Sequence, residues 1–310
     1  MSWILLAAVG QFINSIVAIL DKYIVSDERA LPRPFVYAFY SCLLTGFWVV
    51  IFILGLIPGL SSLGMPSLAN VTAPSLIVVA LSFLSAYTFF LALVSMYDAL
   101  RKADASTVMP IIGSIAGLST FGLSYVFLEA SHSPNFVWGI LLLAVGTMLV
   151  AQTLPKASVV LNCVHSGLFF AFHWITIKGL FLETTFETGF FWSRVGFILF
   201  TLSLLLVPVY LSKIKSQAGT TSVKTGFLVV STKVLAGIAA FLLLKATDMG
   251  DVTVVQALDG LRFVFILLFT SVFAHWLPQS VADKDTRPST FFRRLLFVIV
   301  ISIGFAMLFA

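Results

Sequence analysis

The chain has 310 residues, of which 60% are apolar and only 10% are charged, and its mean hydropathy is +1.08. A soluble domain of this length would cover its core with polar residues, so the composition excludes an ordinary water-soluble fold. The formal net charge is +5, but the basic residues lie mostly in short breaks between long apolar runs. No soluble domain remains to carry a nucleic-acid surface, so the expected surroundings are the lipid bilayer, with no nucleic-acid partner.

Apolar runs of about 20 residues, the length that a helix needs to cross a bilayer, follow one another along the whole chain. In the first half they are 3–25, 34–57, 76–96, 106–128 and 135–154, and in the second half they are 159–182, 188–211, 226–244, 252–276 and 291–309. These runs are too uniformly apolar for the strands of a membrane barrel. The predicted fold class is therefore all-α: a polytopic membrane protein with ten transmembrane helices. We interpret the first run as a retained helix, with Asp21 and Lys22 marking its end.

Basic residues predict the orientation. When the loops are numbered alternately, 13 of the 18 basic residues fall on one side. They are Lys22, Arg29, Arg33, Arg101, Lys102, Lys156, Lys213, Lys215, Lys224, Lys284, Arg287, Arg293 and Arg294. The opposite side has only Lys178 and Lys245, near helix ends, where long side chains snorkel to the interface. Because cytoplasmic loops carry the basic excess, both termini are expected outside the cytoplasm. If the source is bacterial, the expected membrane is the inner membrane.

A short motif occurs twice. Asp104 to Gly113 opens the fourth span, Asp251 to Gly260 opens the ninth, and both fit Asp-x-(Ser/Thr)-x-Val-x-x-x-x-Gly. One copy would be ordinary helix capping, but two copies at equivalent spans indicate an internal repeat. Five spans per half give the copies opposite orientations, as in many secondary transporters. The chain is therefore divided into residues 1–154 and 159–310, two inverted five-helix repeats of one bundle.

With these motifs in this order, the chain resembles the ten-helix branch of the drug/metabolite transporter superfamily, with two EamA-type repeats over nearly its whole length. The resembling pieces are the segment from Ala99 to Pro110, Glu129, Gly139 and Gly146 in the first half, and Arg194 and Gly304 in the second. The chain has Trp276 where Glu129 would align, and no basic residue in span two to match Arg194. Members of the family usually place their termini in the cytoplasm, opposite to the orientation that the basic residues indicate.

Polar side chains at membrane depth are the candidate functional residues, because they are costly there unless they are paired or face water. The candidates for a substrate path are Gln11, Asn14, Asn162, His165, His173, Arg194, Lys233, Gln256, Asp259 and Arg262. Asn162, His165 and His173 share one stripe, as do Gln11, Asn14 and Lys22, and each stripe could line a cavity or form hydrogen bonds between helices. Asp259 and Arg262 are three residues apart and could neutralise each other. Arg194 and Lys233 each need a carboxylate from another helix, a water-filled cavity or a substrate.

The expected function follows from this polar interior. Arg194, Lys233 and Arg262 outnumber Asp259 and Glu129, which favours an anionic or zwitterionic substrate. No phosphate-binding glycine loop, zinc-protease motif or nucleophile elbow is present, so no enzyme, cofactor or metal site is expected. We therefore expect a secondary transporter that moves a small metabolite by alternating access, with a proton or sodium ion as the expected coupling ion. A lipid or lipid-linked-sugar flippase is the alternative, and an assembly protein without transport activity is a third class.

Two small features bear on assembly. Gly113 and Gly117 form a small-xxx-small pair that could serve packing within the chain or in a homodimer, so a monomer and a homodimer both remain open. Cys42 and Cys163 fall in separate apolar spans, which indicates buried free thiols rather than a disulfide framework.

The basic-residue asymmetry predicts which loops an impermeant thiol reagent can reach. With Cys42 and Cys163 replaced by Ser, a single cysteine at Ser62 should be labelled in intact cells, and one at Ser216 only after permeabilisation. Labelling of intact cells at position 216 alone would reverse the assignment.

Overall fold

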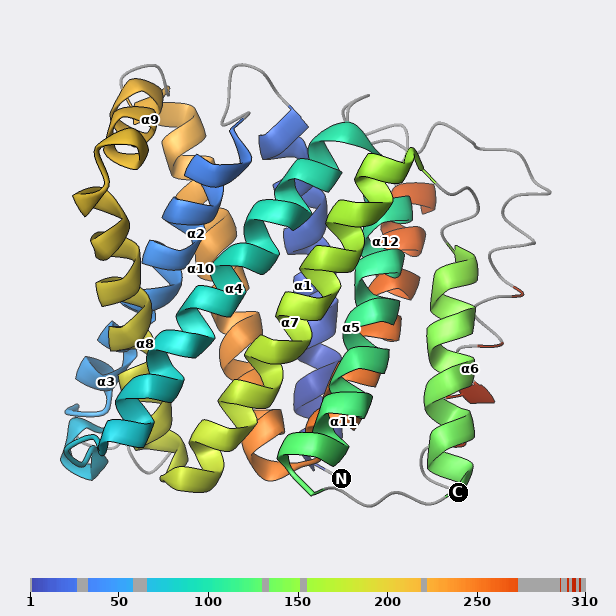
Figure 1. Ribbon diagram of the computed structural model, residues 1–310, viewed down its shortest axis with the longest axis horizontal. Helices are drawn as coiled ribbons and strands as arrows, with labels where there is room; N and C mark the ends of the chain where they lie inside the picture. Colours follow the sequence, from blue (N-terminus) through green and yellow to red (C-terminus); the bar gives the residue numbers. More distant parts are fainter. Residues whose placement is uncertain are drawn as a thin grey trace.

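The computed structural model describes residues 2–26, 33–57, 66–129, 134–150, 155–218 and 222–272, with residues 296, 300, 303, 304 and 307 besides. In this part of the chain all regular structure is helical. Within these ranges, seven helices are long and apolar enough to cross a membrane, and the protein is a multi-pass helical membrane protein (Figure 1). They are α1 (Ser2–Ser26); Pro34–Leu54, comprising α2 (Pro34–Phe47), the 3-10 turn η1 (Trp48–Val50) and α3 (Ile51–Leu54); α4 (Leu76–Lys102); α5 (Ala105–Phe127); α7 (Ala157–Glu183); Phe186–Leu206, comprising α8 (Phe186–Ser203) and the 3-10 turn η4 (Leu204–Leu206); and α10 (Val223–Met249).

Shorter elements complete the bundle. They are η3 (Leu68–Asn70), α6 (Pro134–Val150), α9 (Pro208–Ala218), α11 (Val252–Ala257) and α12 (Asp259–Val272). Helices thus occupy most of the first nine expected spans, and the tenth, 291–309, lies outside the described residues apart from five single positions.

The helix boundaries differ from the expected ones at the seventh and ninth spans. The first helix, expected over 3–25, runs from Ser2 to Ser26, so Lys22, which was counted with the loop charges, lies within α1 beside Asp21. The seventh span stops at Ser203, and a new helix begins at Pro208, which fits the first turn of a helix but not its interior. The ninth span is interrupted at Leu258, which separates α11 from α12.

Hydroxyl and carboxylate side chains fix several helix starts. The side chains of Ser75, Thr185 and Ser222 accept hydrogen bonds from backbone N–H groups three residues on, at 3.2 to 3.3 Å. Asp251 accepts from the N–H groups of Thr253 and Val254 at 2.6 and 3.2 Å. These bonds satisfy donors that would otherwise be left unpaired at a helix end.

The outer surface is apolar. Leu76, Leu206 and Val223 are 84%, 83% and 91% exposed, and many other large apolar side chains share this surface. In water so large an apolar surface would drive aggregation, whereas in a bilayer it contacts lipid. The surface therefore supports the same membrane assignment as the helix lengths.

The first helix of each half packs against the other half. In Figure 1, α7 lies beside α4 and α5, and the residue contacts pair α1 in the same way with α10 and α12. The pair α1 and α10 is antiparallel, because Trp3 packs on Gly250, Gly10 on Leu243, and Asp21 on Lys233. The two sequence halves are thus interlocked along their length.

Two of the residues predicted to form the basic side of the bundle, Arg33 and Lys22, differ in their positions. Arg33 donates a 2.8 Å hydrogen bond to Ser216, which brings the start of α2 and the last turn of α9 together. Lys22 belongs to α1 and is 5% exposed, so it does not contribute to the loop charge. It donates instead to the carbonyl oxygens of Leu100 and Ala103 at the C-terminal end of α4, at 2.6 and 2.8 Å.

Gly113 and Gly117 differ in role. A Cβ atom at Gly113 would lie 2.3 Å from the ring of Phe263 in α12, while nothing lies within 4 Å of one at Gly117. Gly113 therefore serves packing within the chain, one of its two expected roles.

Close helix packing predicts opposite outcomes for two Gly→Ala substitutions. At Gly196 in α8 an added Cβ would lie 2.9 Å from the backbone of Ser82 in α4, whereas at Gly122 in α5 it would meet open space. Gly196→Ala should lower the free energy of unfolding by about 1 to 3 kcal/mol, because backbone cannot yield. Gly122→Ala should be neutral or slightly stabilising, because Ala is the better helix former. Denaturant titration of both variants in one detergent measures the difference, and equal stabilities would contradict the described α4–α8 packing.

Candidate functional site

A cavity lies inside the bundle among α1, α2, α4, α5, α7, α8, α10, α11 and α12. The empty space in it is about 1040 Å³, a figure that includes space open to solvent. Its polar lining consists of Asn14, Asp21, Ser41, Thr45, Tyr97, His173, Arg194, Lys233, Gln256, Asp259 and Arg262. Aromatic side chains, among them Phe89, Phe170, Trp174 and Phe197, cover much of the rest. Charged groups and an apolar wall therefore share one cavity.

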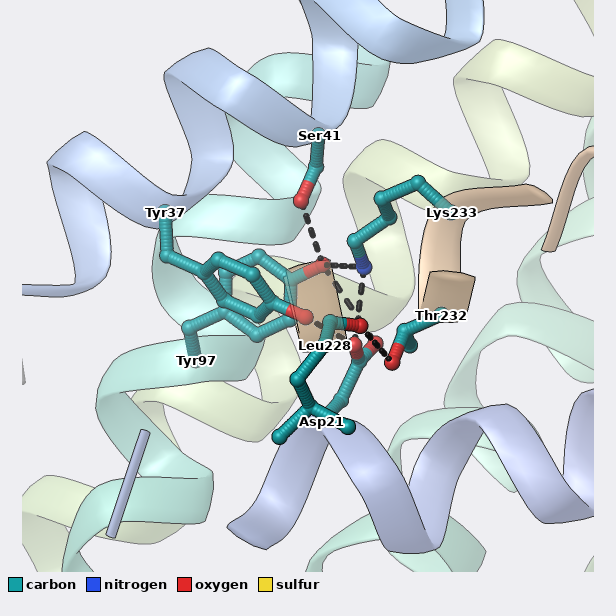
Figure 2. A network of polar contacts seen from close by, with 7 residues as sticks. All are labelled: Asp21, Tyr37, Ser41, Tyr97, Leu228, Thr232 and Lys233. Carbon is teal, nitrogen blue, oxygen red and sulfur yellow. Dashed lines mark hydrogen bonds and ion pairs between the residues drawn. The ribbon is translucent and has the colours of Figure 1, made fainter. Parts of the chain in front are cut away.

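Two residues of the cavity lining, Asp21 and Lys233, form an ion pair. Figure 2 shows this pair with its neighbours. The Lys233 Nζ atom is 2.7 Å from the Asp21 Oδ1 atom, and the two side chains are only 5% and 6% exposed. The pair joins α1 to α10, across 212 residues of sequence. Lys233 was expected to face a carboxylate from another helix, a water-filled cavity or a substrate, and the structure gives it the carboxylate.

Hydroxyl groups from α2 and α4 complete this pair. Tyr37 donates to the Asp21 Oδ1 atom, and Tyr97 lies 3.4 Å from the Oδ2 atom. Lys233 donates to the Tyr97 hydroxyl at 3.0 Å, and Ser41 lies 3.0 Å from the same hydroxyl oxygen, as Figure 2 shows. Four helices thus meet at one network in which both charges have hydrogen-bond partners.

The second charged group is formed by Asp259 and Arg262 of α12. The Arg262 Nη2 atom is 3.0 Å from the Asp259 Oδ2 atom, which confirms that these two side chains neutralise each other. Gln11 of α1 donates through its amide nitrogen to the other Asp259 oxygen. The Gln11 Oε1, Gln256 Nε2 and Arg262 Nε atoms are buried without a hydrogen-bond partner in the described structure. Gln256 and Arg262 line the cavity, so their two atoms are candidates for contact with water or a ligand inside it.

Arg194 of α8 is held differently from the other bases. It is 2% exposed, and its guanidinium lies 5.0 and 4.8 Å from the ring centroids of Phe190 and Phe197. Its Nε atom donates to the Ser193 hydroxyl oxygen at 3.3 Å. Among the residues that the structure describes, no carboxylate lies within ion-pair distance of Arg194. The guanidinium is therefore a buried cation facing the cavity, with only ring and hydroxyl contacts described for it.

Only one residue of the α7 stripe reaches the cavity. Asn162 donates to Asp98 at 2.6 Å, and the His165 Nδ1 atom lies 2.7 Å from the Ser95 hydroxyl oxygen, so both join α7 to α4. His173 also contacts α4, with its Nδ1 atom 3.0 Å from the Ser85 hydroxyl oxygen, but it lines the cavity as well. For Asn162 and His165 the structure therefore favours hydrogen bonding between helices over cavity lining.

The prediction that Gln11, Asn14 and Lys22 share one stripe of α1 was only partly right. Gln11 bonds to Asp259 and Asn14 lines the cavity, but Lys22 points to the end of α4. Asp21, the residue that does line the cavity, was missed because it was read as the end of a span. Its seven-residue spacing from Asn14, about two helical turns, is the signal that places both on one face. Tyr37, Ser41 and Tyr97 carried no comparable signal, since single hydroxyl residues are common in membrane helices.

No family model matches the chain, and no curated protein does either. A solved structure, described only as the crystal structure of a protein, matches over 99% of this chain and 97% of its own with a TM-score of 0.66 and 16% sequence identity. At this identity the likeness shows a shared fold and says nothing of function.

Within the described ranges, no three His, Cys, Asp or Glu side chains gather closely enough to hold a metal ion. Cys42 and Cys163 are free and buried, as their positions in separate spans indicated. The chemistry that the cavity offers is recognition by charge, hydrogen bonds and aromatic surface.

The Asp21–Lys233 pair predicts a non-additive stability cycle. Lys233→Gln should lower the free energy of unfolding by about 3 to 5 kcal/mol, because it leaves the Asp21 carboxylate buried without its counter-charge. Asp21→Asn combined with Lys233→Gln should recover most of this loss, because no unpaired charge remains. Chemical unfolding of the two single variants and the double variant in detergent measures the coupling.

The partly exposed Lys245–Asp248 pair on the same helix is the control. Lys245→Gln should change the free energy of unfolding by no more than about 1 kcal/mol. If the Asp21 and Lys233 effects simply add, the two side chains do not stabilise each other.

Proposed function

We propose that the protein is a secondary transporter that carries a small metabolite across the membrane by alternating access. The observation that carries this proposal is a cavity inside a multi-pass membrane bundle, lined among its described residues with three bases and two carboxylates. Charged groups at membrane depth are costly, and they are typical of substrate or ion pathways. A purely structural bundle would need neither the space nor the charge.

Alternating access requires an outward-facing and an inward-facing conformation of similar structure, and inverted repeats can provide both. We propose ten transmembrane helices in two inverted repeats, residues 1–154 and 159–310. Lys22 near the end of α1 donates to the carbonyls of Leu100 and Ala103, while Lys178 near the end of α7 donates to those of Thr247 and Gly250, both at 2.9 Å. Leu100 and Ala103 lie four residues and one residue before Asp104 in the sequence. Thr247 and Gly250 lie at the same two spacings before Asp251. Lys178 was expected to snorkel, and it stabilises a helix end instead.

The cavity lining supports the same relation. Met109 and Ile112 line the cavity five and eight residues after Asp104, and Gln256 and Asp259 line it five and eight residues after Asp251. The contacts between helices follow the same relation between the two halves. In one case α7 packs on α4 and α5, and in the other α1 packs on α10 and α12.

We further propose membership of the drug/metabolite transporter superfamily, on the basis of the motif order along the chain. A proton or sodium ion is the proposed coupling ion, and a bacterial source would place the protein in the inner membrane. This placement would allow a metabolite gradient and an ion gradient to act on the same bundle.

Reconstitution tests the proposal. Sealed proteoliposomes are incubated with a cell metabolite extract under an imposed proton or sodium gradient, and retained compounds are identified by mass spectrometry. At least one small metabolite should be retained above the level in empty vesicles. Ala236→Phe should largely abolish its uptake, because Ala236 lines the cavity and the added ring fills it.

Val234→Phe is the matched control. Val234 lies on the same helix, 47% exposed on the outer surface, so a ring there should leave uptake unchanged. Scrambling of a fluorescent lipid without metabolite uptake would instead indicate a flippase, and the absence of both activities would indicate an assembly protein.

A further inference from the structure

We propose that Arg194 is the binding point for an oxyanion, and that the substrate is a small organic anion with an apolar or aromatic body. The inference rests on the proposed transport function, because it names the class of molecule that occupies the same cavity. It selects among anionic, zwitterionic and cationic substrates by asking which charged groups in the cavity still lack a counter-charge.

Neither carboxylate in the described cavity lining is free to receive a cation. The Asp21 oxygens face Lys233, Tyr37 and Tyr97, and the Asp259 oxygens face Gln11 and Arg262. An ammonium group on a substrate would have to displace one of these bases and leave it buried without its partner. The described lining therefore disfavours cationic substrates and zwitterions.

Unlike the carboxylates, one of the basic residues in the cavity lining is available to a charged ligand. Lys233 and Arg262 are each matched by an aspartate, whereas Arg194 has no carboxylate within ion-pair distance in the described structure. Three bases and two carboxylates leave the described lining with one excess positive charge. A single oxyanion on a substrate would neutralise it.

The surroundings of Arg194 prepare it for a planar, two-point contact. Phe190 and Phe197 pack near its guanidinium, and the Ser193 hydroxyl accepts from its Nε atom, which limits the orientations of the group. A guanidinium whose remaining N–H groups are free can bind both oxygens of a carboxylate or phosphate at once. Because the group is held before the ligand arrives, little entropy is lost on binding.

The wall near Arg194 indicates the rest of the ligand. Phe197 contacts Phe89, with ring centroids 5.3 Å apart, and Phe89 contacts Phe170 at 5.9 Å, all three rings lining the cavity. Trp174 adds a fourth aromatic side chain to the lining. Such a wall favours an apolar or aromatic body over a sugar or a polyamine.

Ligand-dependent thermal stability of the purified protein tests the inference without requiring transport. Benzoate and phenyl phosphate are the oxyanion probes, phenylalanine is the zwitterion, benzylamine is the cation, and chloride is the simple anion. Benzoate or phenyl phosphate should raise the melting temperature, and whichever acts more strongly identifies the oxyanion. Arg194→Gln should weaken this binding by at least about tenfold.

Two further variants control for indirect effects. Lys245→Gln removes a base outside the cavity lining and should leave the response to the probes unchanged. Arg194→Lys keeps the charge but loses the planar fork, and it should bind more weakly than the wild type but more tightly than Arg194→Gln. Without a ligand, Arg194→Gln should be at least as stable as the wild type, because no carboxylate loses its partner.

Several results would overturn the inference. They are a response to phenylalanine or benzylamine that exceeds the response to both organic anions, an equal response to chloride, no response to any probe, or an undiminished response of Arg194→Gln. The wild-type ligand series decides the matter even if Arg194→Gln fails to fold. Anion binding without uptake in proteoliposomes would refute the transport proposal alone, whereas uptake of a cation unaffected by Arg194→Gln would refute this inference alone.

Discussion

The interior of this bundle is governed by the cost of an uncompensated charge in a low-dielectric medium. Asp21 and Lys233 illustrate the constraint, since each would be expensive alone and together they lie 2.7 Å apart with hydroxyl groups around them. Because one stands on α1 and the other on α10, satisfying the charges also fixes how these helices align. The tyrosines of α2 and α4 bring two more helices to the same point. A local electrostatic requirement thus positions four helices around one side of the cavity.

The same constraint sorts the remaining ionisable groups into two kinds. Asp259 and Arg262 compensate each other on one helix face, and Lys22 and Lys178 place their charge at carbonyl groups that a helix end leaves unpaired. These groups need nothing from outside the protein. Arg194 is of the other kind, since its charge has no such partner in the described structure. This difference, more than the number of bases, makes Arg194 the informative residue of the cavity.

The sequence predicted the features that depend on neighbouring residues. Apolar runs of helix length predicted the seven membrane-capable helices of the described chain, and the three-residue spacing of Asp259 and Arg262 predicted their ion pair. Features that depend on distant residues were not predictable in this way. The partners Asp21 and Lys233 are separated by most of the chain, and Asp21 next to Lys22 looked like the polar end of a helix. Asn162 and His165 show the converse limit, because a polar stripe fits a cavity and a helix contact equally well until the facing helix is known.

The lysine contacts with helix ends bear on how such a chain can change over time. A carbonyl oxygen is present whatever side chain the residue carries, so an ammonium group bound to it places no demand on residue type. Leu100 and Ala103 stand in one half where Thr247 and Gly250 stand in the other, yet the lysine contacts are the same. Selection acting on this contact would preserve the two lysines and the backbone path while letting the acceptor residues drift. If the two proposed repeats descend from one ancestral segment, their relationship would then be preserved in the backbone geometry where the residue types have diverged, and the sequence would show it only as one short motif.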